Sequence, residues 1–276
     1  MIMIERKTNW PLTIFLLIIS APILIMYLWL FIDSISEINT ESIWPTEFTL
    51  RNWRFLVEEI PGHGSVWTAL FNTTVFSTSV VAIVVILSST AGYALSRLKF
   101  PFRAQFLGFV LLLHSFPSVT LIISIFLMLR MIGLYDTLIG VILVKASLEL
   151  PFGVWIMKGF YDTVPWEIEM AGVQDGASRF QVWYKLVLPQ IMPGIAALAI
   201  FSFMAGWSEF VLPLILAPSA DMKLMSVYLA GLVNDDYLSD FGLFKAVGLF
   251  YIIPVMIFYL FTQDKLMNIY GGGTKG

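Results

Sequence analysis

Residues 164–178 read VPWEIEMAGVQDGAS, a polar stretch between two long apolar ones. Pro165 suits the first turn of a helix, and Glu167 and Glu169 place negative charge near the positive N-terminal end of that helix. The stretch therefore predicts a short helix over about 165–175. Because apolar runs flank it on both sides, we expect this helix to lie in water at the face of a membrane protein.

A second short helix is expected directly after the first. Gly176 marks the turn between them, because glycine adopts the left-handed backbone at little cost. Ser178 and Gln181 have the spacing of a capping box, so the second helix begins there and ends before Pro189. The pattern predicts a helix, a glycine turn and a helix.

The composition is that of a membrane protein. Of 276 residues, 58% are hydrophobic and the mean hydropathy is +0.85, whereas soluble domains are about half apolar. Cysteine is absent, which excludes disulfides and thiolate metal sites, and two histidines, His63 and His114, are too few for a histidine-based zinc site. No metal site and no P-loop pattern are found, so the chain is not expected to bind ATP itself.

Several apolar runs are long enough to cross a bilayer, which takes roughly 20 residues. They cover about 11–32, 66–95, 105–129, 137–157, 191–216 and 242–263. An even number of spans puts both termini on one side, and basic residues are enriched in cytoplasmic loops. The termini and the 96–104 and 158–190 loops hold Arg6, Lys7, Arg97, Lys99, Arg103, Lys158, Arg179, Lys185, Lys265 and Lys275, whereas the opposite loops hold Arg51, Arg54, Arg130 and Lys223. Both termini and the 164–178 stretch are therefore predicted to be cytoplasmic.

The 164–178 stretch resembles the EAA loop of binding-protein-dependent ABC importer permeases, especially their carbohydrate, maltose-type branch. The family pattern is Glu-Ala-Ala, three residues, Gly, then about nine residues to Ile-x-Leu-Pro. Ala171, Gly172, residues 175–177 and residues 187–189 stand at matching positions. The sequence departs from the pattern where Met170 replaces the motif glutamate, with Glu169 one residue earlier.

Other stretches extend the resemblance in the expected order. They are AGYALSR at 91–97 followed by Phe100-Pro101, LPFGVW at 150–155, and WSEF at 207–210. The chain divides into 1–66 (tail, first span and extracytoplasmic loop), 67–263 (permease core, with the coupling loop at about 158–190) and 264–276 (cytoplasmic tail). The implied fold is all-α with six transmembrane helices, the type I ABC importer permease fold, in the cell inner (cytoplasmic) membrane.

The resemblance also implies a function and partners. The chain would be the transmembrane subunit of an ATP-driven importer for a carbohydrate or polyol (a sugar, glycerol or glycerol phosphate), and not itself an enzyme. Its partners would be a second, homologous permease, two ATPase subunits that bind ATP and Mg²⁺, an extracytoplasmic solute-binding protein and the lipid bilayer, with no nucleic acid. The helix at 165–175 would be a coupling helix that docks in a cleft of an ATPase subunit. The residues assigned to this role are Glu169, Met170, Ala171, Gly172, Val173, Asp175 and Gly176. The alternative for Ala171 and Gly172 is tight packing against this protein's own helices.

Four residues within predicted spans are assigned to a candidate substrate pathway: Lys145, Glu149, Trp207 and Glu209. Charged groups inside a membrane are costly and usually face protein or a water-filled path. A spacing of four places Lys145 and Glu149 on one helix face. Alternatives remain open: a buried ion pair that joins Lys145 and Glu149 to the partner permease, a structural hydrogen bond from Glu209 to a neighbouring span, and simple packing for Trp207. We interpret His114 as a hydrogen-bond partner between helices.

Two other classes of function compete with this interpretation. A membrane-embedded transferase would need a convergent nucleophile, base or metal set at the membrane face, and the sequence offers no cysteine and two separated histidines. An exporter or channel subunit would not need the EAA-type loop.

Overall fold

The computed structural model describes residues 10–37, 45, 47–234 and 240–271. Within these residues the chain is helical, and its β-structure is confined to the isolated bridges Ser36–Phe48 and Ile60–Gly64. The helices are α1 (Trp10–Ser34), η1 (Arg51–Leu56), α2 (Val66–Arg97), α3 (Arg103–His114), α4 (Ser118–Met131), α5 (Leu138–Asp162), α6 (Trp166–Gln174), α7 (Arg179–Val182), η2 (Trp183–Val187, a π-helical turn), η3 (Leu188–Ile191), α8 (Met192–Trp207), α9 (Val211–Leu216), η4 (Ala220–Met222), α10 (Met225–Asn234) and α11 (Phe241–Gly271). The all-α prediction is confirmed for this part of the chain.

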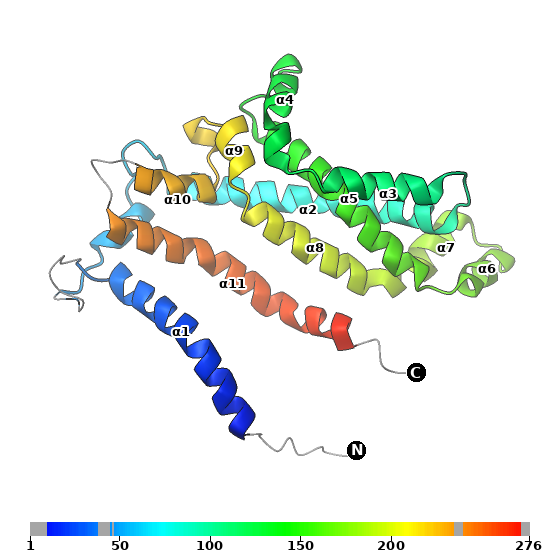
Figure 1. The fold of residues 1–276 in the computed structure, drawn as a ribbon, viewed down its shortest axis with the longest axis horizontal. Coiled ribbons are helices and arrows are strands. Elements are labelled where there is room, and N and C mark those ends of the chain that lie inside the picture. The colour runs from blue at the N-terminus through cyan, green and yellow to red at the C-terminus, as the bar shows by residue number, and fades with distance from the viewer. Residues whose placement is uncertain (1–9, 38–44, 46, 235–239, 272–276) are drawn as a thin grey trace.

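Three long helices, α2, α5 and α8, lie side by side along the length of the molecule, and α11 packs beside α8 (Figure 1). Helices α6 and α7 form one end of this bundle, and α10 lies at the opposite end. Helix α1 packs against α11 and diverges from the rest of the bundle, with almost all of its apolar side chains exposed. That exposure is what lipid contact requires of a spanning helix.

Small residues let α2 and α5 approach closely. A Cβ atom at Gly92 would lie 2.8 Å from Met157 Cβ and 2.9 Å from the backbone nitrogen of Lys158, and one at Gly153 would lie 2.4 Å from Ser88 Oγ. Larger residues would force the two helices apart. Small residues at such crossings are typical of membrane helices, whose association depends on close packing.

Five helices in the described part are long and apolar enough to cross a membrane, and the number is six if the bent pair α3 and α4 counts as one span. The prediction of one continuous span at 105–129 is wrong, because α3 and α4 meet at 91°. Pro117 precedes α4 in an extended conformation (φ −60°, ψ 127°). Proline disfavours helical geometry at the residue before it, which here is Phe116, so α3 ends and the chain turns.

The predicted span at 191–216 also differs from the structure. The continuous helical run covers 179–207, and a break at 208–210 separates it from α9. At this break Glu209 Oε1 accepts a hydrogen bond from the backbone N–H of Leu212 at 3.2 Å, which satisfies a free donor at the start of α9. Helix α11 extends past the predicted end of the last span at 263 to Gly271, while the rest of the predicted tail, 272–276, lies outside the described residues.

At the end of the bundle away from α6, short helices pack together around a second apolar core. Phe55 of η1, Tyr228 of α10 and Val247 of α11 are buried in one apolar cluster. Two ion pairs hold α11 there: Lys245 to Asp33 at 2.6 Å, and Arg54 to Asp240 at 2.8 Å. The stretch between α9 and α11 contains α10, whose apolar residues complete this core.

Candidate functional site

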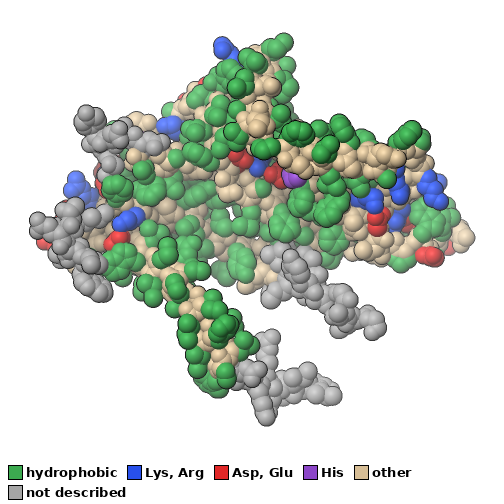
Figure 2. Space-filling model, viewed as in Figure 1, with side chains coloured by type: hydrophobic (Ala, Val, Ile, Leu, Met, Phe, Trp, Pro, Cys, Tyr) green, Lys and Arg blue, Asp and Glu red, His purple; other side chains and the backbone are tan. Residues whose placement is uncertain are grey.

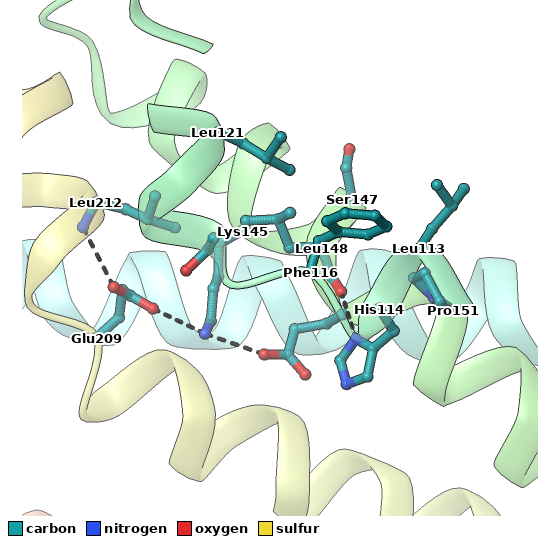
Figure 3. Close-up of a pocket in the computed structure, with 12 residues that line it drawn as sticks. Leu113, His114, Phe116, Leu121, Lys145, Ser147, Leu148, Pro151, Glu209 and Leu212 are labelled. Carbon is teal, nitrogen blue, oxygen red and sulfur yellow. Dashed lines mark hydrogen bonds and ion pairs between the residues drawn. The ribbon is translucent and has the colours of Figure 1, made fainter. Parts of the chain in front are cut away.

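A cavity of about 590 Å³ opens where α3 bends into α4, with α5 and the turn before α9 as its other walls (Figure 3). Most of its lining is apolar, including Leu113, Phe116 and Leu148. The polar residues that line it are His114, Ser118, Lys145, Ser147, Glu149 and Glu209. This mixture of an apolar wall and a few convergent polar groups is typical of a small-molecule site.

Lys145 lies between two carboxylates in this cavity. Its Nζ is 3.0 Å from Glu149 Oε1 on the next turn of α5 and 2.8 Å from Glu209 Oε2, which comes from the break after α8. The side chains are largely buried, with 11% of Lys145, 18% of Glu149 and 15% of Glu209 exposed. Figure 2 shows such a group of acidic and basic side chains beside a histidine, in the middle of an apolar face.

The spacing of four predicted that Lys145 and Glu149 share a helix face, and their ion pair agrees with it. No sequence pattern indicated that Glu209 would join them from another helix. Because both carboxylates contact the same ammonium, the buried charges compensate one another in part, as a low-dielectric setting requires. All three side chains line the cavity, so a ligand that enters it can reach them.

His114 links α3 to α5, as expected of a histidine between helices. Its Nδ1 lies 3.1 Å from the Leu148 carbonyl, and its ring stacks on Phe152 at 5.6 Å. A carbonyl only accepts hydrogen bonds, so Nδ1 is the donor in this contact. Pro151, one turn from this contact, lies inside α5 and lines the same cavity.

Trp207 does not line this cavity. It is 4% exposed and lies between Phe203 and Tyr251, with ring centroids at 5.5 Å and 5.8 Å. The Tyr251 hydroxyl donates to the Trp207 carbonyl. The Trp207 ring is therefore packed between aromatic neighbours and is not among the residues that line the cavity.

Glu169 points toward its own chain. It is 4% exposed and forms an ion pair with Nε of Arg97 in the last turn of α2. The Tyr93 hydroxyl donates to the other carboxylate oxygen at 3.0 Å, and Arg97 also donates to the Val164 carbonyl at 2.8 Å. Sequence reasoning missed Tyr93 and Arg97; their spacing of four, which places both on one face at the end of a span, was the available signal.

The face of α6 next to Glu169 is exposed and apolar. Trp166, Met170 and Val173 follow one another at helical spacing and are 48%, 39% and 41% exposed. Ala171 and Asp175, also assigned to coupling, are exposed as well. Gly172 faces inward: a Cβ there would lie 2.6 Å from Leu186 Cδ1 and 3.0 Å from Val182 Cγ2, so this residue permits close packing against the second half of the same loop.

The glycine turn after α6 has the expected geometry. Gly176 has φ of +85°, and its N–H donates to the Val173 carbonyl at 3.0 Å while the Ala177 N–H donates to Gly172 at 3.1 Å. This pair of bonds is a Schellman motif, which ends a helix at a left-handed residue. Both hydrogen bonds of the capping box at Ser178 and Gln181 are present.

The second helix does not end before Pro189. Helical turns run from α7 through η2 and η3 into α8. Pro189 is accommodated because it lies in the first turn of η3, where a missing N–H costs little. The loop is therefore continuous with α8 and is not separated from it by a flexible linker.

Comparisons with known proteins agree with this arrangement. The model of the family described as "Binding-protein-dependent transport system inner membrane component" matches residues 84–263. The trehalose transport system permease protein SugB of Mycobacterium tuberculosis is 29% identical over 99% of this chain and 99% of its own length. The maltodextrin transport system permease protein MdxG of Bacillus subtilis is 29% identical over 74% of each chain.

Solved structures share the fold. A chain of a bacterial ABC transporter involved in the import of the acidic polysaccharide alginate superposes with a TM-score of 0.75, at 23% identity and over 92% of both chains. A second structure, the alginate transporter in complex with an alginate pentasaccharide-bound periplasmic protein, gives a TM-score of 0.69 at 18% identity, over 95% of this chain and 96% of that one.

Proposed function

This chain belongs to the family of binding-protein-dependent transport system inner membrane components, and we propose that it is one transmembrane subunit of an ATP-driven importer for a carbohydrate or polyol. Members of the family are transport permeases and not enzymes, so the rival assignment as a transferase is dropped. In the proposed complex, ATP and Mg²⁺ bind to two ATPase subunits. A second, homologous permease and an extracytoplasmic binding protein complete it.

The observation that carries the coupling role is the exposed apolar stripe of α6. Trp166, Met170 and Val173 lie on one helix face at the end of the bundle and remain exposed, although the Arg97 guanidinium lies over the Trp166 ring at 5.8 Å. An amphipathic helix with such a stripe docks in an apolar groove of a partner. The excess of basic residues in the neighbouring loops supports a cytoplasmic position for this end, where the ATPase subunits would meet it.

Motion of α6 would pass directly into the bundle. The chain leads from α5 into α6 within four residues, and the Arg97–Glu169 ion pair ties α6 to α2. Since α2 and α5 pack against each other through glycine contacts, the three helices form one stiff unit. When the ATPase subunits close, this unit would move as a rigid body and turn the permease from inward-facing to outward-facing.

The substrate class follows from the relatives and from the cavity. Two relatives are named for trehalose and maltodextrin transport. Lys145, Glu149 and Glu209 offer an ammonium donor and carboxylate acceptors at the edge of an apolar cavity, and these groups suit the hydroxyls of a saccharide. Trp207 has no part in this proposal, because its ring is packed away from the cavity.

The test uses the complete complex, purified with its ATPase subunits and second permease. Met170→Arg combined with Val173→Arg places two charges in the apolar stripe and should release the ATPase subunits, since burying unpaired charge is costly. The control is Gln190→Arg, an exposed position in η3 outside α6. Retention of the ATPase subunits and of substrate-stimulated ATP hydrolysis in the double variant would refute docking through α6.

A further inference from the structure

The charged cluster in the cavity carries one ammonium and two carboxylates, so it has an excess of one negative charge. No Arg, and no Lys other than Lys145, lines the cavity among the described residues. His114 directs Nδ1 to the Leu148 carbonyl and so adds no donor from that nitrogen to the cavity. The cavity is therefore rich in acceptors and poor in donors.

The carboxylates of the cluster keep unused hydrogen-bond acceptor positions. Lys145 Nζ directs two of its three donor positions to Glu149 Oε1 and Glu209 Oε2. Glu209 Oε1 accepts from the Leu212 N–H, whereas Glu149 Oε2 has no partner among the described residues. Glu149 Oε2 is not among the fully buried polar atoms without a partner, so it is open to accept a hydrogen bond from a ligand hydroxyl or ammonium.

An anionic ligand would meet the opposite situation. A uronate or phosphate group would approach two carboxylates in a partly buried site, where like-charge repulsion is screened much less than in water. Such repulsion is an effective way to reject a competing ligand. The single ammonium cannot offset it, because both of its close neighbours are already carboxylates.

We propose that this cavity is a saccharide subsite contributed by this chain, and that its excess negative charge admits neutral or amine-bearing saccharides and rejects uronates and phosphosugars. This inference rests on the proposed function in one respect, that the transported solute is a carbohydrate. It adds the charge class of that solute and assigns the selection to Lys145, Glu149 and Glu209.

The absence of native cysteine makes the local potential measurable. Ser147→Cys puts a thiol on the lining of the cavity without touching the three charged residues. In the assembled complex, the modification rate by cationic aminoethyl methanethiosulfonate is compared with that by anionic sulfonatoethyl methanethiosulfonate. Each rate is divided by the rate with a small free thiol, and the intact mass of this chain reports the modification.

The cationic reagent should react roughly tenfold faster, because one excess charge a few ångströms away favours one reagent and opposes the other. The ratio of the cationic to the anionic modification rate should follow the charge of the cluster. It should be larger with Lys145→Met, near unity with Glu209→Gln, and reversed with Glu149→Gln combined with Glu209→Gln. Because the Ser147→Cys parent and three charge variants form one ordered series, the failure of a single variant to assemble does not prevent the test. A preference that ignores this order, or a thiol that neither reagent reaches, overturns the proposal.

A second measurement tests the saccharide itself. The neutral reagent methyl methanethiosulfonate modifies the same thiol in the presence of maltotriose, a glucosamine disaccharide or trigalacturonate. The first two should slow the reaction and trigalacturonate should not. Protection by trigalacturonate equal to that by maltotriose, or protection by none of the three, would overturn the subsite. Because neither measurement needs ATP hydrolysis, a failure here is distinguishable from a failure of docking through α6.

Discussion

Glu169 and Arg97 form an ion pair that is buried on both sides, with 6% and 9% of the two side chains exposed. The pair joins α6 to the last turn of α2, across 72 positions of the chain. The carboxylate next to the motif position is thus committed to this protein's own bundle. The neighbouring face of α6 stays exposed and carries Met170, at the position where the EAA motif has its glutamate.

Glu169→Ala should therefore weaken the attachment of α6 without altering its exposed face. Removing one partner of a buried pair leaves the Arg97 charge uncompensated, a loss of about 3–5 kcal/mol. We expect a lower melting temperature of the purified complex and ATP hydrolysis that no longer depends on substrate. Glu167→Ala, an exposed position in the same helical turn, is the control and should change neither.

Gly176→Val should leave membrane insertion intact, loosen the ATPase subunits and abolish uptake. The residue has φ of +85°, and a Cβ there would meet nothing within 4 Å, so the penalty is backbone strain alone. That strain costs about 1–2 kcal/mol for most residues and less for asparagine. Gly176→Asn should accordingly retain most activity. Normal uptake by a well-expressed Gly176→Val complex would argue against a coupling role for this turn.

Gly92→Ala should destabilise the bundle where α2 crosses α5. The new methyl group would lie within 3 Å of Met157 Cβ and of a backbone nitrogen, so the helices must separate. Overpacking of this kind costs about 1–3 kcal/mol. Gly248→Ala in α11 is the matched control, because a Cβ there would meet nothing within 4 Å. Equal melting temperatures for the two variants would contradict the close-packed crossing.

Glu149→Gln should separate a structural role of the cluster from a role in the pathway. Lys145 keeps Glu209 as its partner in this variant, so the link between α5 and the break after α8 survives. Loss of a charged hydrogen-bond acceptor for substrate, about 1.5–3 kcal/mol, should lower uptake roughly tenfold or more. Assembly and ATP hydrolysis are measured separately on the same preparation. A complex that falls apart would make the ion pair structural.

Local signals in the sequence determined much of the coupling loop. The capping box at Ser178, the left-handed turn at Gly176 and the short helix over 166–174 were each predicted from a few neighbouring residues. Hydrogen bonds and backbone preferences within one turn decide such features, so no distant residue is needed. Apolar runs likewise located most candidate spans, because a helix that crosses the bilayer needs roughly 20 predominantly apolar residues.

Long-range packing decided the rest. Which face of α6 is buried depends on where Arg97 lies, and Glu209 meets Lys145 only because the break after α8 comes to rest beside α5. The 91° angle between α3 and α4 also depends on tertiary packing. Pro117 ends the helical geometry, but the direction in which α4 continues depends on how both helices pack against α5. Which distant residues come into contact depends on how many side chains from different helices pack together. Periodicity within one segment reports only on that segment, so it cannot predict these contacts.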